Sequence, residues 1–478
     1  DVENSDMTKN TNTSKNVTTA ATGFLPKLKQ LAEAIRNANL IAAGIRGSLL
    51  GSLIAGQIVM PVAVLALPDV NNSYGVDITT STTGSKTKMT IDQNQAVIKI
   101  DWNSFEVGSS ETINFDQAGN SSYIAINNIF DTNGSTIYGN ITADGNVVLI
   151  NPDGIVFAEG SRVDVGGLLA SGLQASNLDT FVSGNSAAGV LTFLGVDDTS
   201  GLVKNSGIIT ASTVALLGKQ VANVKSGNDG IIKAGLTFLS AGNGANVSFD
   251  SGALLSVEVT AEVGKELSDS GLVGESNAAI YNTGSISREG SVGSNEIYID
   301  ADVASDIFSS AVNNTGTIEA FAISTNGSTI SLVGSGAAIN NTGTISANNG
   351  ASISITADEL IIGAQGAVET GTFFGRDAGT ISVKTGVLNV SSASVDYNDF
   401  DLLADVDSKS EANKLNINIS GSSSAMEVSG LSTVVASGAT INGTDAVGET
   451  FTVASTNAVG VNGIDFSGVT TVVAGTAT

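Results

Sequence analysis

The sequence predicts an all-β protein, a right-handed parallel β-helix (β-solenoid) with an N-terminal cap, preceded by a signal peptide. Composition is the first indication, because the 478 residues include 56 Gly, only 4 Pro and 5% aromatic residues. Such a mixture is typical of many short strands joined by tight turns, with small side chains stacked in a narrow interior. The second indication is that short apolar runs alternate with Gly-containing turns, and no stretch after the signal shows helical periodicity over ten residues.

A short phrase that returns along the chain is the third indication. The phrase reads Asn-x-Gly followed by Ile, and it begins at Asn205, Asn228, Asn282, Asn314 and Asn341. In a solenoid, equivalent residues of successive coils stack, so an Asn row can bond to itself while Gly makes the corner and Ile points inward. A series of β-sandwich domains is the alternative, but that architecture favours regular strand spacing of about 8–12 residues and more aromatic residues.

The chain contains no Cys and no His. Their absence excludes disulfides, cysteine nucleophiles and Ser-His-Asp triads, and it removes the commonest general base. The net charge is −26, and residues 1–68 are slightly basic, so the remaining body is strongly acidic. An acidic body should repel nucleic acid and anionic lipid.

The N-terminal part is typical of a targeting sequence. Residues 1–46 are predicted to be a disordered leader with a basic n-region, and residues 47–67 the apolar region of a signal peptide. Val64 and Ala66 supply the small −3 and −1 residues of a cleavage site, so we expect cleavage after Ala66. A transmembrane helix is the alternative, because the apolar run approaches the ~20 residues needed to span a bilayer.

The most informative stretch runs from Met89 to Ser171 and centres on the letters NVVLINPDGIVF. Asn151, Pro152, Asp153 and Gly154 form a turn signal between two apolar runs. Pro fixes φ at the second turn position, Asn and Asp suit the positions around it, and Gly tolerates a left-handed exit.

The ordered set of segments from Tyr74 to Phe249 resembles the secretion domain of two-partner-secreted exoproteins of the filamentous-haemagglutinin and high-molecular-weight adhesin type. The resemblance implies that Trp102 and Phe105 are paired aromatics of the cap. Asn127 and Asn128 stand where the family has Asn-Arg-Val, with Asn128 replacing Arg, and Asp153 replaces the second Asn of the turn. Together, the residues expected to form the secretion motif are Asn127, Asn128, Asn151, Pro152, Asp153 and Gly154.

The resemblance also implies a function. Residues 69–255 would form the secretion domain and residues 256–478 a continuing β-helix stalk with loop excursions, one of them within Ser256–Ser276. The chain would be exported across both membranes of a Gram-negative cell through an outer-membrane barrel transporter with POTRA domains. The expected product is a secreted or surface-attached adhesin that binds an unidentified host-cell or surface receptor and no nucleic acid.

We expect no catalytic residue, no metal and no cofactor. A solenoid polysaccharide-degrading enzyme and the export module of a contact-dependent toxin are the alternatives. An acidic stretch from Asp396 to Glu411 could hold calcium, but its spacing matches no known calcium loop and favours a solvated loop. An ice- or mineral-binding solenoid would need regular Thr-x-Thr rows, and the Thr positions look too irregular for it.

Overall fold

The computed structural model describes residues 67–73, 76–184, 188–264, 277–288, 295–304, 307–322, 328–349, 351–363 and 366–371, and then separate strands to Val473, with side chains to Val368. The predicted leader, the cleavage residue Ala66 and nearly all of the signal region lie outside the described residues. So do the side chains of the acidic stretch from Asp396 to Glu411.

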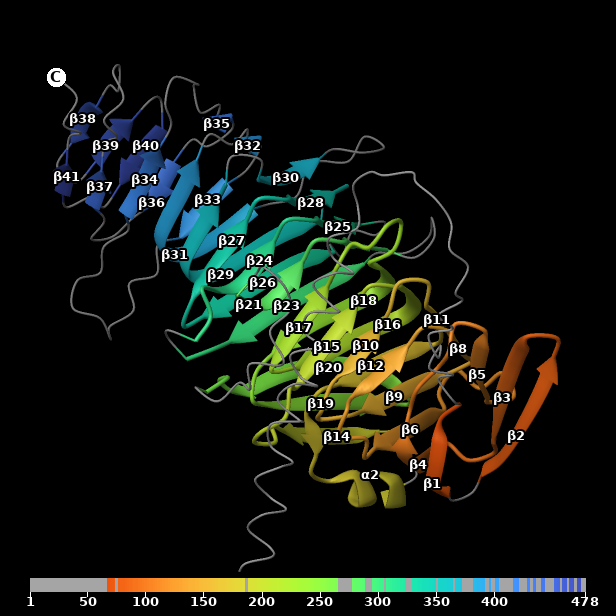
Figure 1. Ribbon diagram of the computed structural model, residues 1–478. Helices are drawn as coiled ribbons and strands as arrows, with labels where there is room; N and C mark the ends of the chain where they lie inside the picture. Colours follow the sequence, from red (N-terminus) through yellow and green to blue (C-terminus); the bar gives the residue numbers. More distant parts are fainter. Residues whose placement is uncertain are drawn as a thin grey trace, which may run out of the picture. The chain divides into compact units, whose positions relative to one another are not determined.

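The described residues form a parallel β-helix, as the sequence predicted (Figure 1). One coil illustrates the path of the chain: β9 (Asn146–Ile150), β10 (Ile155–Phe157) and β11 (Arg162–Asp164) lead to β12 (Gly167–Ser171). Strand β12 pairs in parallel with β9, and Gly167 lies opposite Asn146. One coil therefore contains 21 residues here. The three strands of a coil belong to three faces, which we name A (with β9), B (with β10) and C (with β11).

Strands of equivalent position extend each face. Face A contains β4 (Val97–Ser104), β6 (Ile124–Ile129), β9, β12, the second halves of β16 (Ile208–Gly218) and β18 (Ile231–Ala241), β23 (Glu296–Asp302), β26 (Thr329–Ser335), the first halves of β29 (Ser352–Ile362) and β31 (Ile381–Ser391), β33 (Phe400–Leu403), β36 (Thr433–Val435) and β40 (Ile464–Ser467). Face B contains β7 (Ser135–Ile137), β10, β15 (Leu202–Asn205), β17 (Gln220–Asn223), β21 (Ala278–Asn282), β24 (Ser310–Asn314), β27 (Ala338–Asn341), the second halves of β29 and β31, β34 (Asn416–Ser420), β37 (Thr440–Asn442) and β41 (Thr471–Val473). Face C contains β3 (Lys86–Gln93), β5 (Glu111–Asp116), β8 (Asn140–Ala143), β11, the first halves of β16 and β18, β22 (Ser285–Ser287), β25 (Thr317–Phe321), β28 (Thr344–Asn348) and β30 (Ala367–Gly371).

Apolar residues of face C stack in a continuous row inside the helix. Val163 pairs with Ile209, Ile209 with Ile232, and Ile232 with Ile286, and all four are at most 1% exposed. The row continues through Ile318 and Ile345 in the next coils. Branched aliphatic side chains suit this position because they pack against the residue above and the residue below in the pleated stack.

The corner between faces B and C carries the predicted Asn ladder, with one member corrected. The buried amides run from Asn205 to Asn223, Asn282, Asn314 and Asn341, each Nδ2 donating to the next Oδ1 at 2.7–2.8 Å. The sequence prediction placed Asn228 in this row, which is wrong. Between Asn223 and Gly230 the corner holds a longer loop than the single residue between Asn205 and Gly207, and Gly230 is the residue stacked on Gly207. The Asn-x-Gly motif that begins at Asn228 therefore belongs to the inserted loop.

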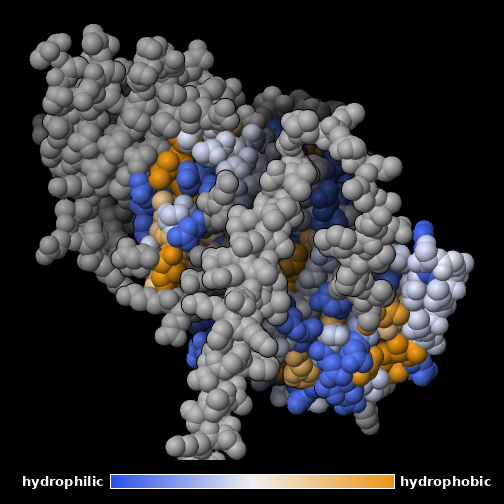
Figure 2. Space-filling model, in the orientation of Figure 1, coloured by the Kyte–Doolittle hydropathy of each residue, from blue (hydrophilic) through white to orange (hydrophobic). Residues whose placement is uncertain are grey.

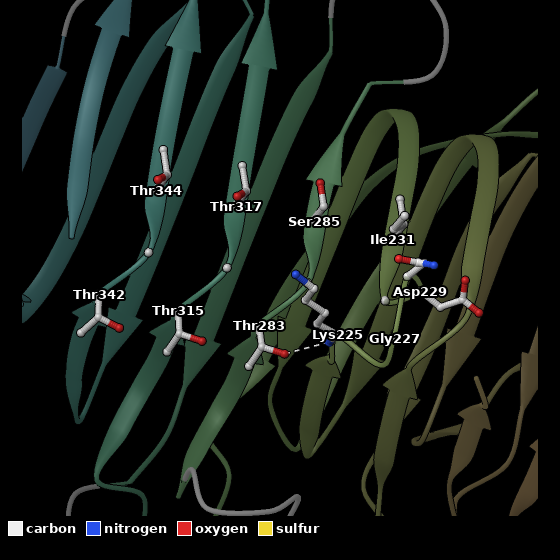
Figure 3. A pocket seen from close by; sticks show the side chains of 15 residues that line it. Lys225, Gly227, Asp229, Ile231, Thr283, Ser285, Thr315, Thr317, Thr342 and Thr344 are labelled. Carbon is white, nitrogen blue, oxygen red and sulfur yellow. Dashed lines mark hydrogen bonds between the residues drawn. The ribbon is translucent and has the colours of Figure 1, made fainter. Parts of the chain in front are cut away.

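Threonine rows border this corner, contrary to the expectation of irregular Thr positions. Thr283, Thr315 and Thr342 follow successive ladder asparagines, and Ser285, Thr317 and Thr344 form a parallel row at the start of face C (Figure 3). A groove of about 650 Å³ runs along both rows. The Lys225 backbone N–H donates to Thr283 Oγ1 at 2.8 Å, so the inserted loop lies at one end of the rows (Figure 3). Repetition of the phrase in three coils produces the rows.

The N-terminal end of the helix is covered by antiparallel strands. Strand β1 (Asp69–Ser73) pairs with β4, and β2 (Val76–Thr83) pairs with β3. Partly buried Val70, Val76 and Ile78 pack against the interior of the first coils. The arrangement is the N-terminal cap that the sequence predicted.

A second, antiparallel sheet covers the outside of face A. It consists of β13 (Gln174–Ala175), β14 (Gly189–Leu194), β19 (Gly244–Asp250) and β20 (Ala253–Ala261). The short helix α2 (Leu178–Gly184) lies between β13 and β14 in the chain. These elements belong to two excursions that leave the corner between faces A and B. Their inner side chains, including Phe193 and Phe249, form a second core with outward residues of face A such as Ile150. Within the predicted excursion at Ser256–Ser276, the described residues include the second part of β20, which pairs with β19 outside the helix.

On the side shown in Figure 2, the coloured atoms are mostly hydrophilic and the apolar patches between them are small. In the described residues, no helix combines the length and the apolar character required to cross a membrane. The remaining described strands are β32 (Val395–Asp396), β35 (Val428–Ser429), β38 (Phe451–Ser455) and β39 (Ala458–Val461).

Candidate functional site

The predicted turn at Asn151–Gly154 forms the corner between faces A and B in the coil of β9 and β10. Asn151 is fully buried, and its Oδ1 accepts the Asp153 backbone N–H at 3.0 Å. Its carbonyl accepts the Gly154 N–H at 3.0 Å, which closes a β-turn. Gly154 has φ +113°, a conformation that Gly adopts without steric cost. Each residue of the turn therefore has the chemistry that its position requires.

The coil below is hydrogen-bonded to this turn. Asn151 Nδ2 donates to Ser135 Oγ at 3.0 Å, and the Ser135 backbone N–H donates to the Gly154 carbonyl at 2.9 Å. The Asn151 side chain thus bonds to its own turn with one end and to the preceding coil with the other. Loss of this amide would leave buried polar groups without partners, at about 1–3 kcal/mol for each group.

The coil above closes over the turn from the other side. Gly201 N–H donates to the Pro152 carbonyl at 3.0 Å, and Ser200 Oγ donates to the Asp153 carbonyl at 2.6 Å. Both residues belong to the returning end of the first excursion. A cavity of about 340 Å³ beside the turn leaves Asp153 and Gly154 among its lining residues. The motif is consequently accessible only in part once the coils have stacked.

Two groups of opposite charge act on Asp153. Burial raises the pKa of its carboxyl group above the usual value, and the nearby carboxylate of Asp131 raises the pKa further. The ammonium group of Lys219 lowers the pKa and partly offsets these effects. Asp153 stands where the family resemblance has Asn, and the structure places the cation of Lys219 in its surroundings.

Asn127 lies inside the helix, one coil below the turn. It is fully buried between Ile100 and Leu149 in the inward row of face A. Its Oδ1 accepts the Trp102 Nε1–H at 3.0 Å, and its Nδ2 donates to the Val148 carbonyl at 3.1 Å. Asn127 therefore satisfies the indole N–H of Trp102 within an apolar interior.

Trp102 and Phe105 are in contact. Both rings are fully buried, with centroids 5.2 Å apart and an interplanar angle of 83°. Such edge-to-face pairs add about 0.5–1.5 kcal/mol beyond the area that they bury. Val70 of strand β1 lies opposite Trp102, so the pair is part of the core beneath the cap.

Asn128 is separated from its neighbour because successive side chains of a strand point to opposite faces. Its Nδ2 donates to Asp101 Oδ1 at 2.9 Å on the outside of face A. Asn128 therefore shares neither the interior of Asn127 nor the corner of Asn151. The structure divides the six predicted motif residues into a turn, an interior amide and a surface amide.

Sequence reasoning missed the partners of the turn. Ser135, Ser200 and Lys219 are common residue types in unremarkable positions, and no motif singles them out. For Lys219 one signal was present, since it is a single lysine between the apolar run VALLG and the letters QVAN. Among the described residues, no group of three or more acidic side chains is placed to hold a metal ion.

Comparison with known proteins gives one family match. The family model described as TPS secretion domain matches residues 68–347. Two heme/hemopexin-binding proteins of Haemophilus influenzae are similar over short regions. One is 34% identical over 119 residues, 25% of this chain and 13% of the relative. The other is 40% identical over 84 residues, 18% of this chain and 9% of the relative.

Two solved structures are similar in part. The HMW1 secretion domain from Haemophilus influenzae aligns with a TM-score of 0.49 and 17% identity, over 85% of this chain and all of that domain. The filamentous hemagglutinin secretion domain aligns with a TM-score of 0.36 and 12% identity, over 70% of this chain and 97% of that domain. The family model covers more than half of the chain, and the chain belongs to the TPS secretion-domain family of two-partner-secreted exoproteins.

Proposed function

We propose that the Asn151–Gly154 turn, together with Asn127 and Asn128, is the secretion motif through which an outer-membrane barrel transporter with POTRA domains exports this chain. The observation that carries the proposal is the Asn151 side chain, fully buried and bonded both to its own turn and to the coil below. Before the coils stack, the same amide is free to bond to a partner. Strand addition to an exposed edge is a recurrent way of binding such segments.

Stacking of each coil on the previous one supplies a direction for export. A chain that crosses the outer membrane unfolded would gain the apolar rows and the Asn ladder one coil at a time. Trp102, Phe105 and the cap strands would form the first surface on which later coils assemble. In this proposal residues 1–46 and 47–67 are the leader and signal region, cleaved after Ala66, while residues 69–255 direct export and residues 256–478 form the stalk.

The exported protein is proposed to be a surface adhesin rather than an enzyme. The absence of His and Cys from the sequence and the family match support this proposal. The aligned regions span 13% and 9% of the curated relatives, so the ligand named for those proteins is not assigned to this chain. Its receptor would be a host-cell or other surface component, bound by regions beyond the motif.

A secretion assay with a matched control tests the motif. The full chain is expressed in a Gram-negative host with and without its cognate transporter, as wild type, Asn151→Ala and Asn282→Ala. Asn282 is also a buried amide with two amide partners, but it lies in the ladder, far along the chain from the turn. We expect transporter-dependent protein in the medium for wild type and Asn282→Ala, and at least a tenfold loss for Asn151→Ala.

Equal losses in the two variants would contradict a specific role for the turn, because the effect would then follow from destabilisation alone. Release that does not depend on the transporter would contradict the proposed export route. Thermal unfolding of the purified variants provides the necessary comparison of their stabilities.

A further inference from the structure

Lys219 is a buried lysine at the corner between faces A and B, two coils above the Asn151–Gly154 turn. It is 4% exposed, and its Nζ donates to the Val196 carbonyl at 2.6 Å, the Thr199 carbonyl at 3.1 Å and Thr199 Oγ1 at 3.4 Å. An ammonium group has three donors, and all three find an acceptor in one short segment. Lys219 thus fixes the segment Val196–Gly201, the returning end of the first excursion.

The segment has a conformation that needs to be held. Asp198 and Gly201 have φ values of +58° and +56°. A positive φ is uncommon for a residue with a side chain, such as Asp198. Thr199 Oγ1 also donates to the Val196 carbonyl at 2.7 Å, which closes the segment on itself. The Lys219 backbone N–H donates to the Gly201 carbonyl at 2.9 Å, so main chain and side chain of one residue bind both ends.

The fixed segment is the same one that covers the turn. Ser200 and Gly201 donate to the carbonyls of Asp153 and Pro152, as described above. A continuous set of hydrogen bonds therefore joins Lys219 Nζ to the segment and the segment to the turn. Lys219 itself contacts no residue of the turn through a hydrogen bond, and its effect passes through the segment.

The ammonium group of Lys219 is buried at a cost that its surroundings offset only in part. Burial lowers the pKa of the Lys219 ammonium group, and the carboxylates of Asp197, Asp198 and Asp153 oppose that effect. A buried charge is stable only when it is paired and hydrogen-bonded. The net effect is a lowered pKa, so burial of the ammonium group has a cost, which its three hydrogen bonds to the segment offset in part.

We propose that Lys219 is a positioning residue that holds Val196–Gly201 over the Asn151–Gly154 turn, so that a partner can reach the turn only before this part of the chain has folded. If the chain is exported from its N-terminus, the turn leaves the transporter before Lys219, because Lys219 follows it in the sequence. Binding of the turn and closure by Lys219 exclude one another. The part of this inference that concerns the transporter rests on the proposed function, and the part that concerns closure does not.

Amide hydrogen exchange on the purified full chain tests the closure. Lys219→Met keeps the apolar stem and removes the ammonium group, and the exposed Lys233→Met is the matched control. In Lys219→Met we expect at least tenfold faster exchange in peptides covering 151–157 and 196–203, with no change in a peptide covering the ladder residues 282–287. Ser200→Ala removes the bond to the Asp153 carbonyl and a longer one, at 3.4 Å, from the Leu202 N–H to Ser200 Oγ. This variant should accelerate 151–157 to a smaller extent, which preserves the test if Lys219→Met does not fold.

Unchanged exchange at 151–157 in both variants, or equal acceleration in 282–287, would overturn the proposal. A second measurement separates it from the proposed function: binding of each folded chain to the purified cognate transporter. Faster exchange accompanied by at least tenfold tighter binding supports both. Faster exchange without a gain in binding supports closure by Lys219 and contradicts recognition of the turn.

Discussion

The two corners that flank face B solve the same problem in different ways. At the corner between faces B and C, successive coils repeat one side chain, and the Asn205–Asn341 ladder satisfies itself by stacking. At the corner between faces A and B, each coil is different: a Pro-containing turn, a returning excursion and a buried lysine bind one another in specific pairs. The repeated side chain can stabilise every coil in the same way. The specific pairs, by contrast, occur at one place in the helix and distinguish that corner from the others.

The largest expected effect comes from crowding the repeated corner. A Cβ at Gly316 would lie 2.2 Å from the Gly284 carbonyl oxygen, whereas at Gly154 it would lie 2.8 Å from the hydroxyl of Ser200, which can rotate away. We expect Gly316→Ala to cost about 3–4 kcal/mol and Gly154→Ala about 2 kcal/mol, the latter mainly from backbone strain. Urea unfolding of both variants measures the difference. A smaller loss for Gly316→Ala would show that the repeated corner adapts more easily than its close stacking indicates.

Removing one amide from the ladder should have the next largest effect. Asn282→Ala leaves Asn223 Nδ2 and Asn314 Oδ1 without their ladder partners, at a cost of about 2–3 kcal/mol. Adding Asn314→Ala should cost less than the sum of the two single changes, because one broken bond is shared. Adding Asn151→Ala to Asn282→Ala should be additive within about 0.5 kcal/mol. Additive losses for the ladder pair would contradict a continuous row.

The pH dependence of stability should differ between the corners. Asp300 lies near the end of β23, where face A approaches its second excursion, and burial with the neighbouring Asp302 raises its pKa to about 6. Because the folded state favours the protonated form, this carboxyl group is harmless below about pH 4 and destabilises the fold as the pH rises through 6. Asp300→Asn should therefore stabilise the protein by about 2–3 kcal/mol at pH 7 and by little at pH 4. Thermal unfolding at both pH values measures this, and an equal gain at both would exclude titration as the cause.

At the corner between faces B and C, the carboxylate of Asp229 should change stability with pH in the opposite direction. Its effect should be the smallest of those predicted here. Asp229 accepts hydrogen bonds from the Gly160 N–H at 2.8 Å and from Arg162 at 3.0 Å. Burial opposes ionisation, but these bonds prevail and lower the pKa of Asp229 below its usual value. Its contribution is present above the unfolded-state pKa and lost in acid, so Asp229→Asn should cost about 1 kcal/mol near pH 7 and less near pH 3. The same thermal series includes this variant, and a loss that grows in acid would contradict the assignment.

Prediction from the sequence succeeded where the pattern repeats. The apolar row through Ile209, Ile232 and Ile286 and most of the Asn ladder could be predicted, because identical coils place identical residues at equal positions. Prediction was wrong at Asn228, because the inserted loop contains the same Asn-x-Gly motif as the corner. The pairing of Trp102 with Phe105 came from the family resemblance, but its bond to Asn127 did not.

By itself the sequence determined a β-helix and a tight turn at Asn151–Gly154, because stacking periodicity and turn chemistry are local properties of the chain. The link from that turn to a secretion domain came from the family resemblance. Only the tertiary structure decided what surrounds that turn. Ser135 and Ser200 bond to it from the coils before and after, and Lys219 bonds to the segment that carries Ser200. The spacing of these residues along the chain depends on an excursion whose length follows no repeat. Which residues return to the corner depends on how the excursion packs against face A, and that packing is a property of the tertiary structure.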